Sequence, residues 1–175
     1  AMDDSVNEEN KNLQSENNSE TNSQLCNQIK TMMKKAFWDS FSESIEQGET
    51  KHLCVLLEEI ATKLKRLTPN RHDLHEEIDE KIDPSFIKQL ITGGSFDSKM
   101  FYAIMEFIVS RVIALESAAS NEETKKWYSS FLQDCSEQSY KEILPVFFKK
   151  MNERLDEIQK QCDTIRQELQ QESQI

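Results

Sequence analysis

Two histidines on one expected helix come nearest to the spacing of a metal site. His72 and His75 stand three positions apart with Glu76 and Glu77 beside them, and residues three apart share one face of an α-helix. Imidazole and carboxylate groups placed in this way can bind a zinc ion. No third or fourth ligand follows at a matching spacing, so we predict no bound metal. We expect His75 to be partly buried or to cap a helix end.

A pair of glycines is the other feature that could carry chemistry. Gly93 and Gly94 precede an expected helix N-terminus, where backbone amides can hold an anion. The chain has only three glycines, however, and neither GxGxxG nor GxxxxGK occurs. Serine, histidine and cysteine are present, but none stands in a glycine-framed nucleophile turn. We therefore predict no catalytic residue and no cofactor, and interpret the glycine pair as a break between helices.

Charge and cysteine usage limit the class of partner. The net charge of −11 disfavours nucleic acid and anionic membranes, because binding to either depends on clustered Lys and Arg. No signal peptide is evident, and no apolar stretch approaches the about 20 residues that span a bilayer. We expect a cytoplasmic protein. Four cysteines without close spacing agree with a reducing compartment, namely Cys26, Cys54, Cys135 and Cys162.

The elements that must position these residues are helices. Apolar side chains recur every three or four residues, and only three glycines and three prolines interrupt the chain. The pattern predicts an all-α bundle of about six to seven helices. We expect a disordered acidic tail over residues 1–23, a helical bundle domain over 24–150 and a heptad helix extension over 151–175.

Several helix boundaries are marked by capping residues. Asp83 precedes Pro84, and Asp97 follows the two glycines, so each aspartate is expected to cap a helix. The helix after Asp97 is strongly apolar and should be the central one. Asn121 is expected to cap the next helix. Between Pro84 and the glycines, a short helix is expected to bury Phe86, Ile87, Leu90 and Ile91.

The last helix follows a heptad pattern. Its apolar residues alternate spacings of four and three, which places Phe148, Leu155, Cys162 and Leu169 at position a and Leu144, Met151, Ile158 and Ile165 at position d. Two interpretations remain open. Either the first half packs on the domain and the rest extends beyond it, or residues from about Met151 onward project as an arm that pairs with another helix. Pro145 must lie in the first turn or kink the helix.

Blocks of residues in order along the chain resemble the T-complex protein 11 family. The KAFWD segment is Lys35–Asp39, and an LLxEI helix follows at Leu56–Ile60. Next come a proline and a histidine, an EI and LD segment, and a spaced isoleucine, glutamine, glycine and aspartate. These are Pro69 and His72; Glu77, Ile78, Ile82 and Asp83; and Ile87, Gln89, Gly94 and Asp97. The resemblance covers about residues 28–131, but the family's CAPxRDEE segment is replaced by LESAASNEE at Leu115–Glu123.

This resemblance implies a non-enzymatic helical protein linked to cyclic-AMP and protein kinase A signalling, and in animals to the cilium or flagellum. We expect a regulator or scaffold that binds other proteins through helix–helix contacts. The alternative is a structural coiled-coil homo-oligomer with a helical head domain. The predicted partner-binding residues lie on the first helix and on the heptad helix: Lys34, Lys35, Trp38, Asp39, Leu155, Ile158, Cys162, Ile165 and Leu169.

Overall fold

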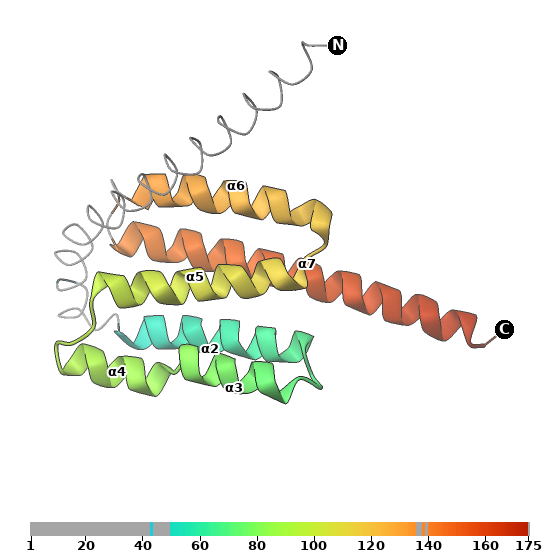
Figure 1. Ribbon diagram of the computed structural model, residues 1–175, viewed down its shortest axis with the longest axis horizontal. Helices are drawn as coiled ribbons and strands as arrows, with labels where there is room; N and C mark the ends of the chain where they lie inside the picture. The colour runs from blue at the N-terminus through green and yellow to red at the C-terminus, as the bar shows by residue number, and fades with distance from the viewer. Residues whose placement is uncertain (1–42, 44–49, 136–137, 139, 175) are drawn as a thin grey trace, which may run out of the picture.

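A computed structural model describes residues 43, 50–135, 138 and 140–174. Six α-helices account for most of this part of the chain (Figure 1). They are α2 (Thr50–Leu67), α3 (His72–Lys81), α4 (Pro84–Thr92), α5 (Ser98–Leu115), α6 (Ala118–Cys135) and α7 (Tyr140–Glu172). The predicted all-α class is confirmed. The tail over 1–23 and the helix expected from Leu25 lie outside the described residues.

Helix α5 lies at the centre of the bundle, as its apolar composition predicts. It contacts α2, α6 and α7 (Figure 1). Ile108 and Val112 of α5 are fully buried, and each buried aliphatic side chain contributes roughly 1.5–3 kcal/mol to folding. A cluster of aromatic rings joins α6 to α7, where Phe131 and Phe147 lie 5.6 Å apart. One continuous core therefore connects the central helix to the last one.

Local chemistry explains several of the helix boundaries. Asp83 Oδ1 accepts a hydrogen bond of 3.1 Å from the backbone amide of Phe86, and Asp97 Oδ1 accepts one of 2.8 Å from that of Met100. Both predicted aspartate caps are confirmed. The break at the glycine pair is confirmed too, since Gly94 has a φ of 72°, which side chains other than glycine rarely adopt.

Two predictions about local structure are wrong. Helix α6 begins at Ala118, so Asn121 lies within it, and the amides of Ser120 and Asn121 bond to the carbonyl of Ser117. Phe86 is 54% exposed, because α4 is short and buries a narrow stripe through Ile87 and Ile91 instead.

Proline is accommodated inside the last helix. Pro145 lies within α7 and beyond its first turn, so of the two predicted possibilities, a place in the first turn or a kink, the first is excluded. The buried residues on either side of it, Leu144 and Phe147, belong to the same core. The helix continues through the proline, and its 33 residues make it about 50 Å long at about 1.5 Å per residue.

Candidate interaction surface

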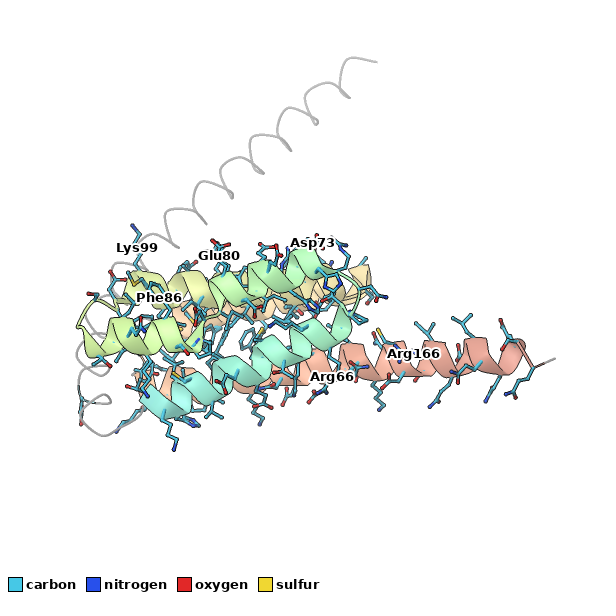
Figure 2. The ribbon with its side chains drawn as sticks, turned by 90° about the horizontal axis from the view of Figure 1, so that it is seen from below. Arg66, Asp73, Glu80, Phe86, Lys99 and Arg166 are labelled. Atoms are coloured by element: carbon cyan, nitrogen blue, oxygen red, sulfur yellow. The ribbon has the colours of Figure 1, made fainter. Side chains whose placement is uncertain are left out.

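Helix α7 consists of a packed part and a projecting part. Its buried residues end at Ile158, whereas every residue from Lys160 to Gln174 is exposed. Figure 2 shows Arg166 on the portion of α7 that extends past the other helices. About 13 residues, or about 20 Å of helix, therefore lie outside the bundle. An isolated helix of that length is marginal in water, so the packed part must stabilise it.

The predicted partner-binding residues of α7 fall on both parts. Leu155 and Ile158 are 1% and 5% exposed and pack in the chain's own core. The projecting part therefore starts after Ile158, later than the position near Met151 considered from the sequence. Ile165 and Leu169 are 57% and 61% exposed, and Cys162 is exposed as well. The outer seam, defined here as Cys162, Ile165 and Leu169, is what remains of the heptad surface for a partner.

The other predicted partner-binding residues belong to the KAFWD segment and its flank. Lys34, Lys35, Trp38 and Asp39 lie outside the residues that the structure describes. Their proposed role stays a prediction.

One ion pair, between Lys63 and Asp156, joins α2 to α7 just before α7 leaves the bundle. Lys63 Nζ lies 2.8 Å from Asp156 Oδ1 and 3.5 Å from Glu59 Oε1. Asp156 is 65% exposed, so solvent screens the pair and its contribution to stability is about 1 kcal/mol at most. The pair lies next to Ile158, the last buried residue of α7 in the sequence.

A buried carboxylate provides a stronger link to α7. Glu116 has a fully buried side chain and lies 2.6 Å from Arg154 Nε. Thr124 Oγ1 lies 2.8 and 2.9 Å from the two carboxylate oxygens of Glu116, so one hydroxyl proton is shared between them. Hydrogen bonds to charged groups are about twice as strong as neutral ones. The Glu116 carboxylate, just after α5, thus bonds to both α6 and α7. Sequence reasoning missed this cluster.

His75 plays a structural role. His75 Nε2 lies 2.7 Å from the carbonyl oxygen of Thr68 and 3.1 Å from that of Lys65, so it caps the C-terminal end of α2, as expected. The His72 ring lies edge-on to it at 6.2 Å. Within the described part of the chain, no group of three or more His, Cys, Asp or Glu side chains is placed to hold a metal ion.

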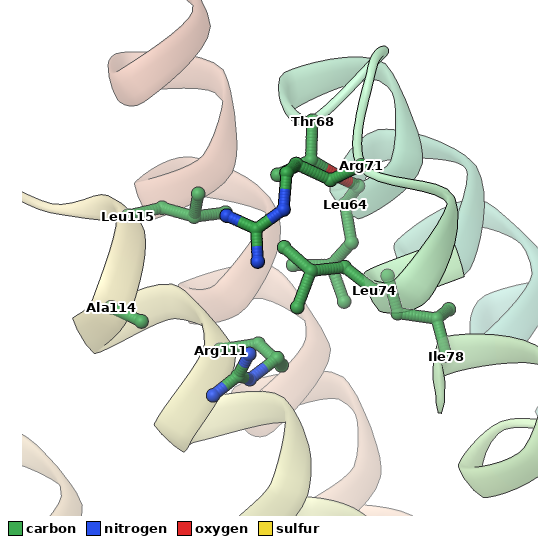
Figure 3. Close-up of a pocket in the computed structure, with 8 residues that line it drawn as sticks. All are labelled: Leu64, Thr68, Arg71, Leu74, Ile78, Arg111, Ala114 and Leu115. Carbon is green, nitrogen blue, oxygen red and sulfur yellow. The ribbon is translucent and has the colours of Figure 1, made fainter. Parts of the chain in front are cut away.

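A pocket between α2, α3 and α5 was not predicted from the sequence. Its volume is about 270 Å³, and Figure 3 shows the guanidinium groups of Arg71 and Arg111 on either side of Leu74. The remaining lining residues are largely apolar: Leu64, Thr68, Ile78, Ala114 and Leu115. We call this the arginine pocket. The two arginines are 40 positions apart in the chain, so no local spacing could reveal it.

The two arginines of this pocket differ in their partners. Arg71 makes two hydrogen bonds, of 3.0 and 2.9 Å, to the carboxylate of Asp73, and these lower the pKa of Asp73 to about 2. Arg111 Nε, by contrast, is buried with no hydrogen-bond partner among the described residues. Of the two arginines, Arg111 is therefore the one whose positive charge is not balanced by a carboxylate.

The three described cysteines differ in environment. Cys135 is buried, and the loss of hydration raises the pKa of its thiol to about 12. Burial also raises the pKa of Cys54, whose Sγ donates to the carbonyl of Pro84 at 3.6 Å. Cys162 stands exposed on the outer seam. None of the three forms a disulfide.

Comparison with known proteins identifies one family. The model of the T-complex protein 11 family matches residues 9–112, which is more than half of the 175-residue chain. No curated protein and no solved structure matches the chain significantly. The family match covers α2, α3, α4 and α5 up to Val112, and the outer seam lies beyond it. None of the described helices is long and apolar enough to cross a membrane.

Proposed function

Since the chain belongs to the T-complex protein 11 family, we propose that it is a non-enzymatic interaction module that presents its outer seam to a partner helix. The observation that carries the proposal is the exposure of Ile165 and Leu169, at 57% and 61%. Both continue the heptad spacing of side chains that are buried earlier in the same helix. Leaving two large aliphatic groups in water forgoes burial worth roughly 1.5–3 kcal/mol each.

The length of the outer seam favours a different protein over a second copy as partner. Cys162, Ile165 and Leu169 lie within eight residues, about one heptad, whereas a coiled coil is expected over about three to four heptads. Two copies of so short a seam would bury little surface. A longer helix from another protein could cover the seam and continue onto the bundle, and would thereby bury more apolar surface.

Charge adds little selectivity along this seam. From Lys160 to Gln174 the charged side chains are two basic and three acidic ones, and five glutamines stand among them. Apolar contact with the outer seam is therefore expected to dominate binding. The acidity of the whole chain, with its net charge of −11, favours a partner helix that carries Lys or Arg beside its apolar face.

The cellular setting is part of this proposal. By its resemblance, the module acts as a regulator or scaffold in cyclic-AMP and protein kinase A signalling, in the cytoplasm and in animals at the cilium or flagellum. The KAFWD segment, with Lys34, Lys35, Trp38 and Asp39, is proposed as a second partner-binding surface.

Two measurements test the use of the outer seam. Affinity capture from a native extract is run with the chain and with the double variant Ile165→Glu and Leu169→Glu. The matched control, Thr164→Glu and Gln167→Glu, adds the same charge to the same exposed segment off the seam. We expect the seam variant to lose partners that the control keeps. Equal capture by both variants would contradict the proposal.

Sedimentation of the isolated chain separates the alternative. A homo-oligomer predicts that the full chain sediments as an oligomer and that a chain ending at Gln159 sediments as a monomer. Our proposal expects a monomer in both cases.

A further inference from the structure

The arginine pocket combines an apolar interior with a cation that lacks a partner. Leu64 and Ile78 in its wall are 1% and 2% exposed. Arg111 is half-buried on α5, and its Nε is shielded from solvent without an acceptor among the described residues. Leaving a buried donor of a charged group unpaired costs stability, and an anion placed beside it would recover that loss.

The second arginine extends the positive side of the pocket. Figure 3 shows the guanidinium of Arg71 directed toward Leu115. Arg71 is 60% exposed and is paired with Asp73, which is 65% exposed. Because solvent weakens that pair, a ligand can compete with Asp73 for Arg71. Arg71 can thus add a second contact to an anion that Arg111 holds.

Size and lining define the chemical class of the ligand. The volume of about 270 Å³ is roughly twice that of the ~150 Å³ engineered cavity that takes up benzene, and lies just below the about 300 Å³ at which drug-sized sites begin. The walls are mostly aliphatic. Arg71 shares its charge with Asp73, so the lining carries about one uncompensated positive charge, which matches a singly charged ligand better than a phosphate dianion. The fit is to a single negative charge on a small apolar body.

We propose that the arginine pocket is a binding site for a small amphiphilic carboxylate, whose acid group contacts Arg111 and Arg71 and whose apolar body lies against Leu64, Leu74 and Leu115. The residues that line the site belong to α2, α3, α5 and the connection between α2 and α3. None of them belongs to the outer seam. The site is therefore independent of the proposed function, and variants of α7 do not test it.

Methyl NMR spectra of the full chain during titration provide the test. Octanoate is the probe, octanol lacks its charge and acetate lacks its apolar chain. We expect octanoate to shift the methyl signals of Leu64, Leu74 and Leu115 and to bind at least about tenfold more tightly than either control, since a charge-assisted contact is worth about 1.5–3 kcal/mol. Absence of octanoate binding, or equal binding of octanoate and octanol, would overturn the proposal.

Three variants test which arginine contacts the carboxylate of octanoate. Arg111→Gln is expected to weaken octanoate binding about tenfold, whereas Asp73→Asn, which releases Arg71, should strengthen it severalfold. Arg166→Gln on the projecting part of α7 is the matched control and should change nothing. Unchanged affinity in Arg111→Gln would refute the assignment. Should that variant not fold, Asp73→Asn decides, because it replaces one exposed side chain and only frees another, Arg71. Failure to strengthen binding would then count against the site.

Discussion

Arg154 on α7 donates a hydrogen bond of 2.6 Å to Glu116, 38 positions earlier in the chain, and the carboxylate that accepts it is fully buried. A buried charge is stable only while its partners are present. Glu116→Ala removes the acceptor of both Arg154 and Thr124, so we expect it to lower the free energy of unfolding by about 3–5 kcal/mol. Urea denaturation followed by circular dichroism measures this change.

An exposed pair supplies the contrast. Lys125 lies 3.7 Å from Glu122, with 56% and 73% of the two side chains exposed. Lys125→Ala should change stability by less than about 0.5 kcal/mol. Similar losses in Glu116→Ala and Lys125→Ala would show that burial of the Glu116 carboxylate does not matter.

Truncation distinguishes the two parts of α7. A chain that ends at Gln159 lacks only exposed residues of the described helix, so its stability should stay within about 0.5 kcal/mol of the full chain. A chain that ends at Lys150 also loses Met151, Leu155 and Ile158, which are at most 5% exposed. Each such loss costs about 2–5 kcal/mol, which is enough together to unfold a marginally stable domain. Thermal melts of the two truncated chains compare them directly.

Thiol reactivity should follow exposure. Iodoacetamide at pH 8 is expected to modify Cys162 long before Cys135, because the raised pKa of about 12 leaves almost no thiolate at Cys135. Cys54 should react at an intermediate rate, since its pKa is raised but its side chain is only partly buried. Peptide mass spectrometry over a time course gives the three rates. Early modification of Cys135 would mean that α6 and α7 separate readily.

The pKa of Asp73 reports on the arginine pocket. Arg71 lowers that pKa from 3.8 to about 2, so the Arg71–Asp73 pair stabilises the folded state above about pH 3.8, and this contribution disappears as the pH falls toward 2. Arg71→Gln should return the pKa of Asp73 toward its ordinary value. Carboxyl NMR titration measures the change, and Arg66→Gln, which removes a cation of α2 that does not bond to Asp73, should leave the titration unaltered.

Replacing the unpaired arginine should stabilise the protein. Arg111→Met keeps an extended apolar stem and removes a partly buried charge without a partner, so we expect a gain of about 1 kcal/mol. Arg166→Met on the projecting helix should have no effect. A loss of stability in Arg111→Met would indicate that the guanidinium already has an acceptor. A gain would mean that this arginine is retained at some cost to stability.

Features set by neighbouring residues could be predicted from the sequence, and features set by packing could not. Asp83, Gly94 and Asp97 each act within a few residues, so their roles follow from residue type and spacing. The partners of Glu116 stand 8 and 38 positions away, and Arg71 and Arg111 line one pocket only because α3 and α5 both pack against α2. Phe86 shows the same limit. The width of the buried face of α4 depends on the helices packed against it, and the sequence of α4 alone does not give it.

The heptad pattern illustrates both sides of this limit. It identified the long final helix and the spacing of its apolar side chains, which depend on the chain alone. It could not locate the point at which the helix leaves the bundle. That point lies after Ile158 because α2 and α5 end nearby, at Leu67 and Leu115.

The uninterrupted course of α7 has a mechanical consequence. The helix is continuous from Tyr140 to Glu172, so its outer and inner portions twist as a single rod. Any torque that a bound helix applies at Leu169 is transmitted to Phe147 and Met151 in the core, unless the backbone breaks between them. The Arg154–Glu116 pair lies on this path, between the exposed end of α7 and the buried Met151.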